Sequence, residues 1–172
     1  IWTAGPGGIT PLGASGSIER GFPGSWNPGT CGTGSSGRRW IISGVRDLWT
    51  VHPDDESPKR VTVAIPGAVE MSFASESADG ALWVATRGGM CAAPAAEVAA
   101  GLAVSWRCEP FPEGDVSSLE TMPSGDLWAL TWDPNALLRR TQGRWEVVPG
   151  STRLGVTWIA SMRPSPSVGA PM

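Results

Sequence analysis

The 172-residue sequence contains no tyrosine, a single histidine and no excess of positive charge. Its formal net charge is −3, from 16 acidic and 13 basic residues. Without a basic stripe, binding to the phosphate backbone of a nucleic acid has no electrostatic basis. No apolar run approaches the roughly 18 to 20 residues that span a bilayer. We therefore expect neither nucleic acid as a partner nor a membrane span.

The scarcity of histidine also restricts catalytic and metal chemistry. His52 is followed by Asp54, Asp55 and Glu56, but a zinc site needs three or four ligands, mostly nitrogen or sulfur, and a catalytic triad could be built only around this histidine. An oxygen-rich loop could hold calcium, yet a solvated acidic turn is the simpler interpretation. We predict no metal and no cofactor. The sequence leaves open whether the protein is an enzyme and favours a non-catalytic role.

A glycine-rich segment, residues 32–37, has the spacing of a dinucleotide-binding fingerprint. That motif works where a strand ends and a helix begins, so that helix amides meet the pyrophosphate. Residues 38–42 instead have the pattern of a strand, which indicates a loop without nucleotide.

A short pattern that contains tryptophan recurs along the chain. It is fullest from Ser124 to Thr131, and the tryptophans of its copies, Trp2, Trp49, Trp83 and Trp128, are 47, 34 and 45 residues apart. Around the fullest copy, four short segments with strand patterns follow one another. Self-similarity at about 40 to 45 residues with four strands per unit is typical of β-propeller blades. The 23 glycines and 16 prolines also favour an all-β protein with tight turns.

The predicted fold is therefore an all-β propeller built from four-stranded antiparallel blades, about four in this chain. Residues 1–163 would form the blades, starting near residues 38, 69, 116 and 156, and residues 164–172 a flexible tail. Residues 156–162 match the first strand at 116–122 position by position. We expect them to pair with residues 1–20 and close a small ring. The alternative is part of a larger ring, which docks on further blades or another chain, and a chain without an initiating methionine is expected to be processed or partial.

Two of the three cysteines fall on neighbouring strands of one expected blade. Cys91 comes shortly after the strand of Trp83, and Cys108 comes just after Trp106. Neighbouring antiparallel strands bring Cα atoms to about 4.5 to 5.5 Å, a distance that a disulfide accepts. We predict a Cys91–Cys108 disulfide and, with it, a secreted, periplasmic or cell-surface location. Cys31 is left over in a loop.

The segment Asp79–Gly89, with relatives at residues 1–8 and 125–131, resembles the repeats of the two-component-regulator propeller group and its bacterial extracellular relatives. The resemblance covers nearly the whole chain and implies a propeller fold. It leaves the activity open, because one fold hosts unrelated functions. The sequence departs from the pattern at Asp47, where the turn glycine is absent, and in the long loop of residues 21–37.

Two enzyme families among propellers can be compared with these residues. The turn that begins at Ser77 is similar to a sialidase motif but is one residue short between Asp79 and Gly80, and the chain has no tyrosine to serve as the usual nucleophile. Streptogramin-lyase-like propellers share the Gly-x-Leu-Trp strand, although their usual Phe-Thr-Glu continuation is absent. A propeller lyase of that kind is the enzymatic alternative.

The ten tryptophans are the remaining clue to function. A tryptophan at the same place in every blade is expected to fill the wedge between neighbouring sheets, burying on the order of 200 Å². Trp26 and Trp132 fall in connections instead. With Asn27, Arg39 and Asp133 they are the candidate ligand-binding residues. We predict a recognition or assembly module that binds a protein or glycan partner through its blade loops, with a tryptophan-based lectin as a further alternative.

Overall fold

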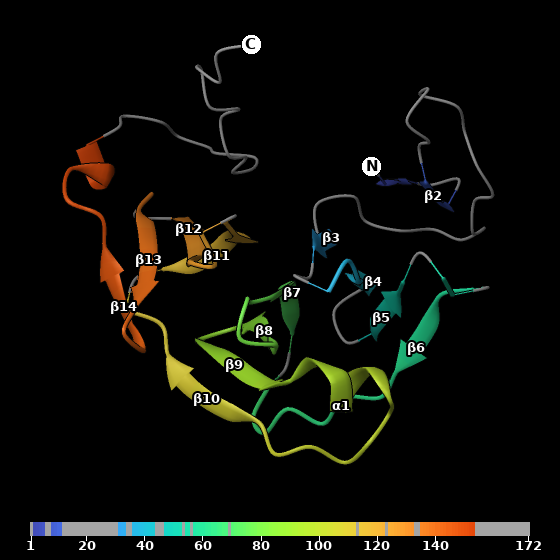
Figure 1. Cartoon of the computed structure of the whole chain (residues 1–172). Coiled ribbons are helices and arrows are strands. Elements are labelled where there is room, and N and C mark those ends of the chain that lie inside the picture. Colours follow the sequence, from blue (N-terminus) through green and yellow to red (C-terminus); the bar gives the residue numbers. More distant parts are fainter. Residues whose placement is uncertain are drawn as a thin grey trace, which may run out of the picture.

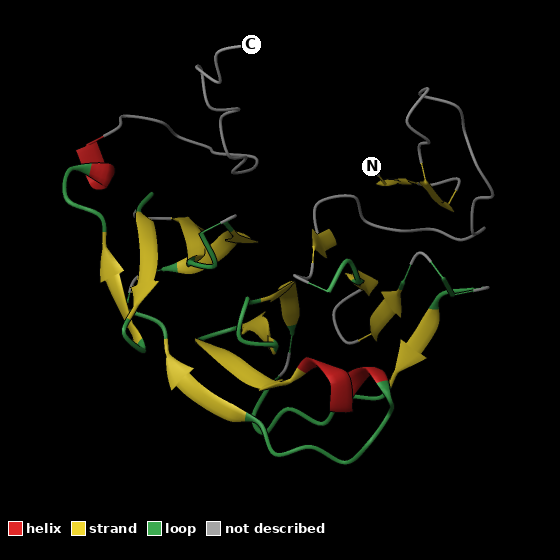
Figure 2. Cartoon of the chain, in the orientation of Figure 1, coloured by secondary structure: helices red, strands yellow, loops and turns green. Residues whose placement is uncertain are grey.

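The computed structural model describes residues 2–5, 8–11, 31–33, 36–43, 47–52, 54–55, 57–68, 70–112, 114–122, 124–132 and 135–153. Within these residues the strands form three four-stranded sheets and one two-stranded sheet, all antiparallel. We call the larger sheets blade 1, blade 2 and blade 3, in chain order. They lie side by side in an arc (Figures 1 and 2).

Each blade pairs its strands in chain order. Blade 1 contains β3 (Cys31–Thr33), β4 (Arg39–Ser43), β5 (Asp47–Val51) and β6 (Lys59–Val61). Blade 2 contains β7 (Met71–Glu76), β8 (Ala81–Thr86), β9 (Gly89–Pro94) and β10 (Arg107–Pro110). Blade 3 contains β11 (Asp115–Thr121), β12 (Leu127–Trp132), β13 (Leu137–Thr141) and β14 (Arg144–Val147).

The other described elements are short. The two-stranded sheet consists of β1 (Trp2–Gly5) and β2 (Gly8–Pro11), α1 (Ala95–Ala99) follows β9, and a 3-10 turn (Ser151–Arg153) follows β14. Strands β3, β7 and β11 lie on the inner side of the arc and β6, β10 and β14 on its outer side (Figure 1). This arrangement of antiparallel blades confirms the predicted fold class.

A positive-φ glycine marks the start of the second strand in every blade. The φ angles are 81°, 79° and 87° at Gly37, Gly80 and Gly125, a conformation that glycine adopts without steric cost. Each glycine lies three residues before a tryptophan of the second strand: Trp40, Trp83 and Trp128.

The tryptophan repeat therefore passes through Trp40 in blade 1, and our placement of it at Trp49 was wrong. Trp49 lies on β5, the third strand of its sheet. The error has a local cause, because Asp47-Leu48-Trp49 repeats the tripeptide that ends at Trp128.

Blade 1 also begins earlier than the expected start near residue 38. Strand β3 pairs with β4 in the register Cys31 to Ile41 and Thr33 to Arg39, so part of the expected loop at 21–37 belongs to the sheet. The three residues Cys-Gly-Thr show no polar and apolar alternation that would predict a strand. Composition could not reveal such a strand.

Blade 2 is buried on both faces, because alternate residues of a strand point to opposite sides of the sheet. Leu82 and Val84 pack with Trp40 and Ile42 of blade 1. Trp83 and its neighbours on the opposite face of blade 2 pack with residues of blade 3, among them Val116, Leu119, Leu127 and Ala129. The hydrophobic core thus lies between blades, as expected for a repeat array.

Burial differs among the tryptophans of the repeat. The exposed fraction is 0% for Trp40 and 2% for Trp83, whereas Trp49 and Trp128 are partly exposed. The expectation that the repeat tryptophan is buried holds for Trp83 and fails in part for Trp49 and Trp128. The side chain of Trp2 lies outside the described residues.

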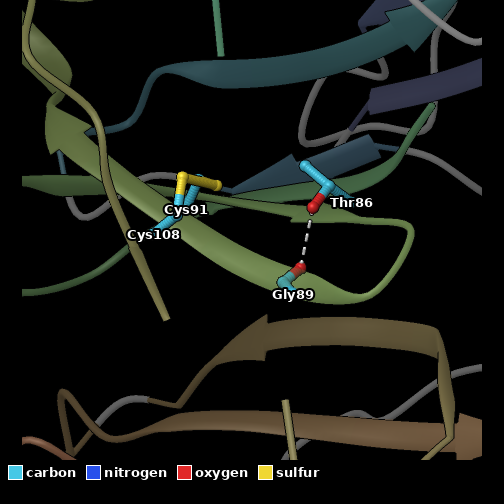
Figure 3. Close-up of a disulfide and its surroundings, with 4 residues drawn as sticks. All are labelled: Thr86, Gly89, Cys91 and Cys108. Atoms are coloured by element: carbon cyan, nitrogen blue, oxygen red, sulfur yellow. Dashed lines mark hydrogen bonds between the residues drawn. A yellow bond between two sulfur atoms is a disulfide. The ribbon is translucent and has the colours of Figure 1, made fainter. Parts of the chain in front are cut away.

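The predicted disulfide is confirmed. Cys91 and Cys108 are directly opposite each other on β9 and β10, and their Sγ atoms are bonded (Figure 3). Cys91 is 3% exposed and belongs to the core between blades 1 and 2. The expected ring-closing strand at 156–162 and the tail at 164–172 lie outside the described residues.

Candidate functional site

Blades 2 and 3 carry equivalent pairs of residues at the edge where their second strands end. In blade 2 the backbone N–H of Arg87 donates to the carbonyl of Glu70 at 3.4 Å. In blade 3 Asp115 is directly opposite Trp132 in the ladder of β11 and β12. Residues opposite each other have Cβ atoms about 4.5 to 5.5 Å apart, so the side chains of Asp115 and Trp132 start from neighbouring points on the sheet.

The two pairs border a groove between the blades, with a volume of about 380 Å³. We call it the Trp132 groove. Its lining residues are Glu70, Ser72, Thr86, Arg87, Asp115, Val116 and Trp132.

The inner strands bend at the same place in both blades. The register shifts between Met71 and Phe73 in β7, and between Val116 and Ser118 in β11. A bulge of this kind increases the local twist and re-aims side chains. The same backbone geometry therefore forms the groove edge in both blades, and only the residues on that edge differ.

The side chains in the groove are available for a partner. Trp132 is 45% exposed, and Glu70, Arg87 and Asp115 are exposed as well. Among the described residues, none of these three charged groups has an ion-pair partner. An exposed indole beside unpaired charges is a surface that gains contacts when another molecule covers it.

The sequence-predicted site residues do not form one cluster in the described structure. Trp132 lines the groove, whereas Arg39 lies in β4 of blade 1, where its partly buried side chain leaves Nη1 without a hydrogen-bond partner among the described residues. Trp26, Asn27 and Asp133 lie outside those residues.

Sequence reasoning missed the other charged residues of the groove. Arg87 and Trp132 each come seven residues after the turn glycine of their blade, and Glu70 and Asp115 each come directly before the inner residue that opens the bulge. Aligning the copies on the turn glycine, rather than on tryptophan alone, would have found them.

A second cavity, of about 350 Å³, lies on the side of α1. Glu76, 4% exposed, accepts hydrogen bonds there from Trp40 Nε1 at 3.1 Å and Ser36 Oγ at 3.0 Å. Arg38 and Lys59 also line it, and both pair with Asp55, at 3.5 and 3.3 Å. Glu76 thus joins blade 2 to blade 1, whereas the ion pairs of Arg38 and Lys59 with Asp55 lie within blade 1, and these charged groups are already satisfied by the protein.

The hydrogen-bond and ion-pair partners of Asp55 also change the pKa of its carboxyl. Burial raises the pKa of its carboxyl, but the backbone N–H of His52, at 2.8 Å, and the ammonium of Lys59 outweigh burial and lower it below its usual value. The single histidine is held in this same turn, with Nδ1 3.2 Å from the carboxylate of Asp54.

Other chemistry has little support among the described residues. They contain no group of three or more His, Cys, Asp or Glu side chains arranged to hold a metal ion. No helix in this part of the chain is long and apolar enough to cross a membrane.

Three solved structures show what the chain is similar to. A streptogramin B lyase has a TM-score of 0.61 at 16% identity, with 86% of this chain and 50% of the lyase covered. A catalytically inactive histidine-to-alanine variant of virginiamycin B lyase from Staphylococcus aureus, with quinupristin, has a TM-score of 0.56 at 16% identity, with 84% and 50% covered. Ycf48 bound to D1 peptide has a TM-score of 0.60 at 14% identity, with 87% and 52% covered.

The chain therefore spans about half the length of these proteins. At such low identity the likeness shows the fold alone: the described sheets are part of a β-propeller. No protein-family model matches the chain, and no curated protein matches it in sequence. The resemblance to two-component-regulator repeats thus holds for the propeller fold and shows no family membership.

Proposed function

We propose that the protein is a non-catalytic recognition or assembly module that binds a segment of a partner protein in the Trp132 groove. The observation that carries the proposal is the exposed indole of Trp132, fixed at a strand end beside Asp115. Tryptophan supplies large contact area at low conformational cost and is enriched among the residues that dominate binding energy. Because the strands of two packed blades hold these side chains, little further ordering is needed on binding.

The fold is compatible with this role and with an enzymatic one. Ycf48, which has the same fold, was solved bound to D1 peptide. The lyases share the fold too, and the inactive S. aureus variant lacks a histidine. In this chain the single histidine, His52, follows β5, at the sheet edge where β4 begins rather than at the edge of the groove. The Trp132 groove therefore contains no histidine, and for this groove we favour recognition over a lyase reaction.

A glycan is the second candidate for the same groove. The flat face of Trp132 could stack on a sugar ring, and the neighbouring Asp115 could accept hydrogen bonds from its hydroxyl groups. We favour a protein segment because Arg87 and Glu70 extend the groove with charges of both signs, which suits a polypeptide better than a neutral sugar.

The disulfide supports a secreted, periplasmic or cell-surface location for this module. Disulfides such as Cys91–Cys108 persist in oxidising compartments and are rare in the cytosol.

Selection from a library of displayed random peptides tests the proposed function. We expect peptides to be enriched on the wild-type protein, and Trp132→Ala to weaken their binding by roughly tenfold or more. Leu102→Ala is the matched control, because Leu102 is also an exposed apolar residue, at 58%, and does not line the groove. Peptide binding that survives Trp132→Ala would contradict the proposal. Binding of oligosaccharides instead, lost in Trp132→Ala, would favour the lectin.

A further inference from the structure

The charges of the Trp132 groove are unevenly distributed between its two blades. The lining contains two acidic side chains, Glu70 and Asp115, and one basic side chain, Arg87. Glu70 lies across the strand pair from Arg87, so the two charges of blade 2 partly compensate each other. Asp115 lies across from the uncharged Trp132. The excess negative charge of the groove therefore sits on blade 3, next to the indole.

Such a pair recognises positive charge by two additive interactions. The face of an indole attracts a cation through the negative potential of its ring. A carboxylate beside it attracts the same cation directly, and it does so more strongly where a bound partner excludes water. The protein already uses the first interaction inside blade 3, where the Arg139 guanidinium lies 5.8 Å from the centroid of Trp128.

We propose that the Trp132 groove selects a basic side chain, arginine or lysine, of the partner segment. This inference rests on the proposed function and names the chemistry of its ligand. The cationic group of the ligand stacks on Trp132 and pairs with Asp115. Arg87, on the other side of the groove, donates to a main-chain carbonyl or an acidic side chain of the same segment.

Arg87 also gives the groove a direction. Its positive charge is separated from Asp115 by the boundary between blades 2 and 3, so a cationic side chain is attracted to Asp115 on blade 3 and meets no net attraction on blade 2, where Arg87 offsets Glu70. A ligand that carries a basic residue thus has one favourable orientation, whereas an uncharged ligand is not oriented by these groups.

The test uses peptides selected on the wild-type protein. The basic residue of the best peptide is replaced by citrulline, which keeps the shape of arginine and removes its charge. We expect this change to weaken binding to the wild-type protein roughly tenfold. In Asp115→Asn the same change should have a smaller effect, about threefold, because half of the binding free energy of the cationic group is gone. Glu97→Gln, an exposed acid-to-amide change on α1, is the control and should keep the full citrulline effect.

The outcomes separate the two proposals. Selected peptides that bind through Trp132 but show no enrichment of arginine or lysine, or no loss on citrulline substitution, would overturn the basic-residue inference and leave the proposed function standing. A citrulline effect that is equal in Asp115→Asn and wild type would overturn the assignment to Asp115. Failure to select any peptide, or binding indifferent to Trp132→Ala, would overturn both.

Discussion

The two interfaces between blades occupy equivalent positions in the fold, but their side chains and polar contacts differ. Between blades 1 and 2 the core is largely aliphatic, and its one fully buried indole, Trp40, donates across the interface to Glu76 at 3.1 Å. Between blades 2 and 3 an aromatic cluster packs on an otherwise aliphatic core: Trp145 packs edge-on against Trp83, with centroids 6.3 Å apart, and against Phe111, at 5.0 Å.

The polar contacts differ as well. At the second interface Arg140 of blade 3 places its guanidinium 4.2 Å from the centroid of Trp83 and pairs with Glu109 of β10 at 3.3 Å. The indole N–H of Trp83 stays within its own blade and donates to Ser77 at 3.2 Å. What the repeat preserves is a large flat side chain after a left-handed glycine, while the hydrogen-bond partner of that side chain is free to vary.

The largest expected effect comes from removing the repeat tryptophans. Trp40→Ala and Trp83→Ala should each lower the free energy of unfolding by roughly 3 to 5 kcal/mol, as truncations of large buried aromatic residues do. Trp128→Ala should cost less, because this side chain is partly exposed. Denaturant unfolding of the three variants measures the order. If Trp128→Ala were less stable than the other two variants, burial of the indole would not explain the order of stabilities.

The disulfide should rank next, because it joins strands that serve both interfaces. Cys91 packs in the core between blades 1 and 2, and the strand of Cys108 carries Glu109 of the second interface. The bridge closes a loop with a sequence separation of 17, so the Cys91→Ala/Cys108→Ala double variant should lose about 3 kcal/mol. Thermal unfolding of the wild type with and without reductant should show the same loss. Equal melting temperatures would contradict this prediction.

The turn glycines provide a matched pair at the second interface. Alanine at Gly80 or Gly125 would be forced into the left-handed region, at a cost of about 1 to 2 kcal/mol. A Cβ at Gly80 meets no atom within 4 Å, whereas one at Gly125 lies 2.9 Å from the Cβ of Ala78 in blade 2. Gly125→Ala should therefore be the more destabilising of the two. Adding Ala78→Gly should restore only the difference, and no restoration would show that the contact between blades is irrelevant.

The smallest expected effect is a loss of folding stability at acid pH, caused by carboxyl groups in the same two turns. The hydroxyl of Ser77 lowers the pKa of Asp79, and the hydroxyl of Ser124, together with Arg139, lowers that of Asp126. A carboxyl whose folded pKa lies below its ordinary value of 3.8 stabilises the fold fully above that pH, and the stabilisation is lost as the pH falls through the lowered pKa.

Unfolding measured between neutral pH and about pH 2 checks this prediction. The contribution of Asp79 should be below about 1 kcal/mol, because the group is largely exposed and screened. Asp79→Asn should flatten the acid limb of the stability curve. An unchanged slope would assign the acid sensitivity to other groups.

The sequence predicted the architecture better than the register of its repeat. The features that define a blade, namely the turn glycine, the alternation of polar and apolar residues and the tryptophan, are local in the sequence. The all-β class and the disulfide between Cys91 and Cys108 could therefore be inferred. The first blade was misread because Arg38 and Arg39 stand before Trp40, where the other copies end in leucine before tryptophan. Strand β3, with its glycine, gave no pattern at all.

The Trp132 groove could not be predicted from the sequence of any single strand. Trp132 could be singled out because it is not one of the repeat tryptophans, but its expected place in a connection was wrong, since it is the last residue of β12. Its neighbours Asp115, Glu70 and Arg87 join it only when two strand pairs from two blades come together, and each taken alone reads as an ordinary exposed charge. The equivalent bulges of β7 and β11 are the structural feature that links them.

The most direct test of the account is to follow the indole N–H signals by NMR while a selected peptide is added, with the signals assigned by single Trp→Phe variants. We predict that the signal of Trp132 shifts strongly and saturates with the peptide. The signals of Trp40 and Trp83, buried between blades, should stay in place. A saturating peptide that leaves the Trp132 signal unmoved would contradict the assignment of the Trp132 groove as the recognition site.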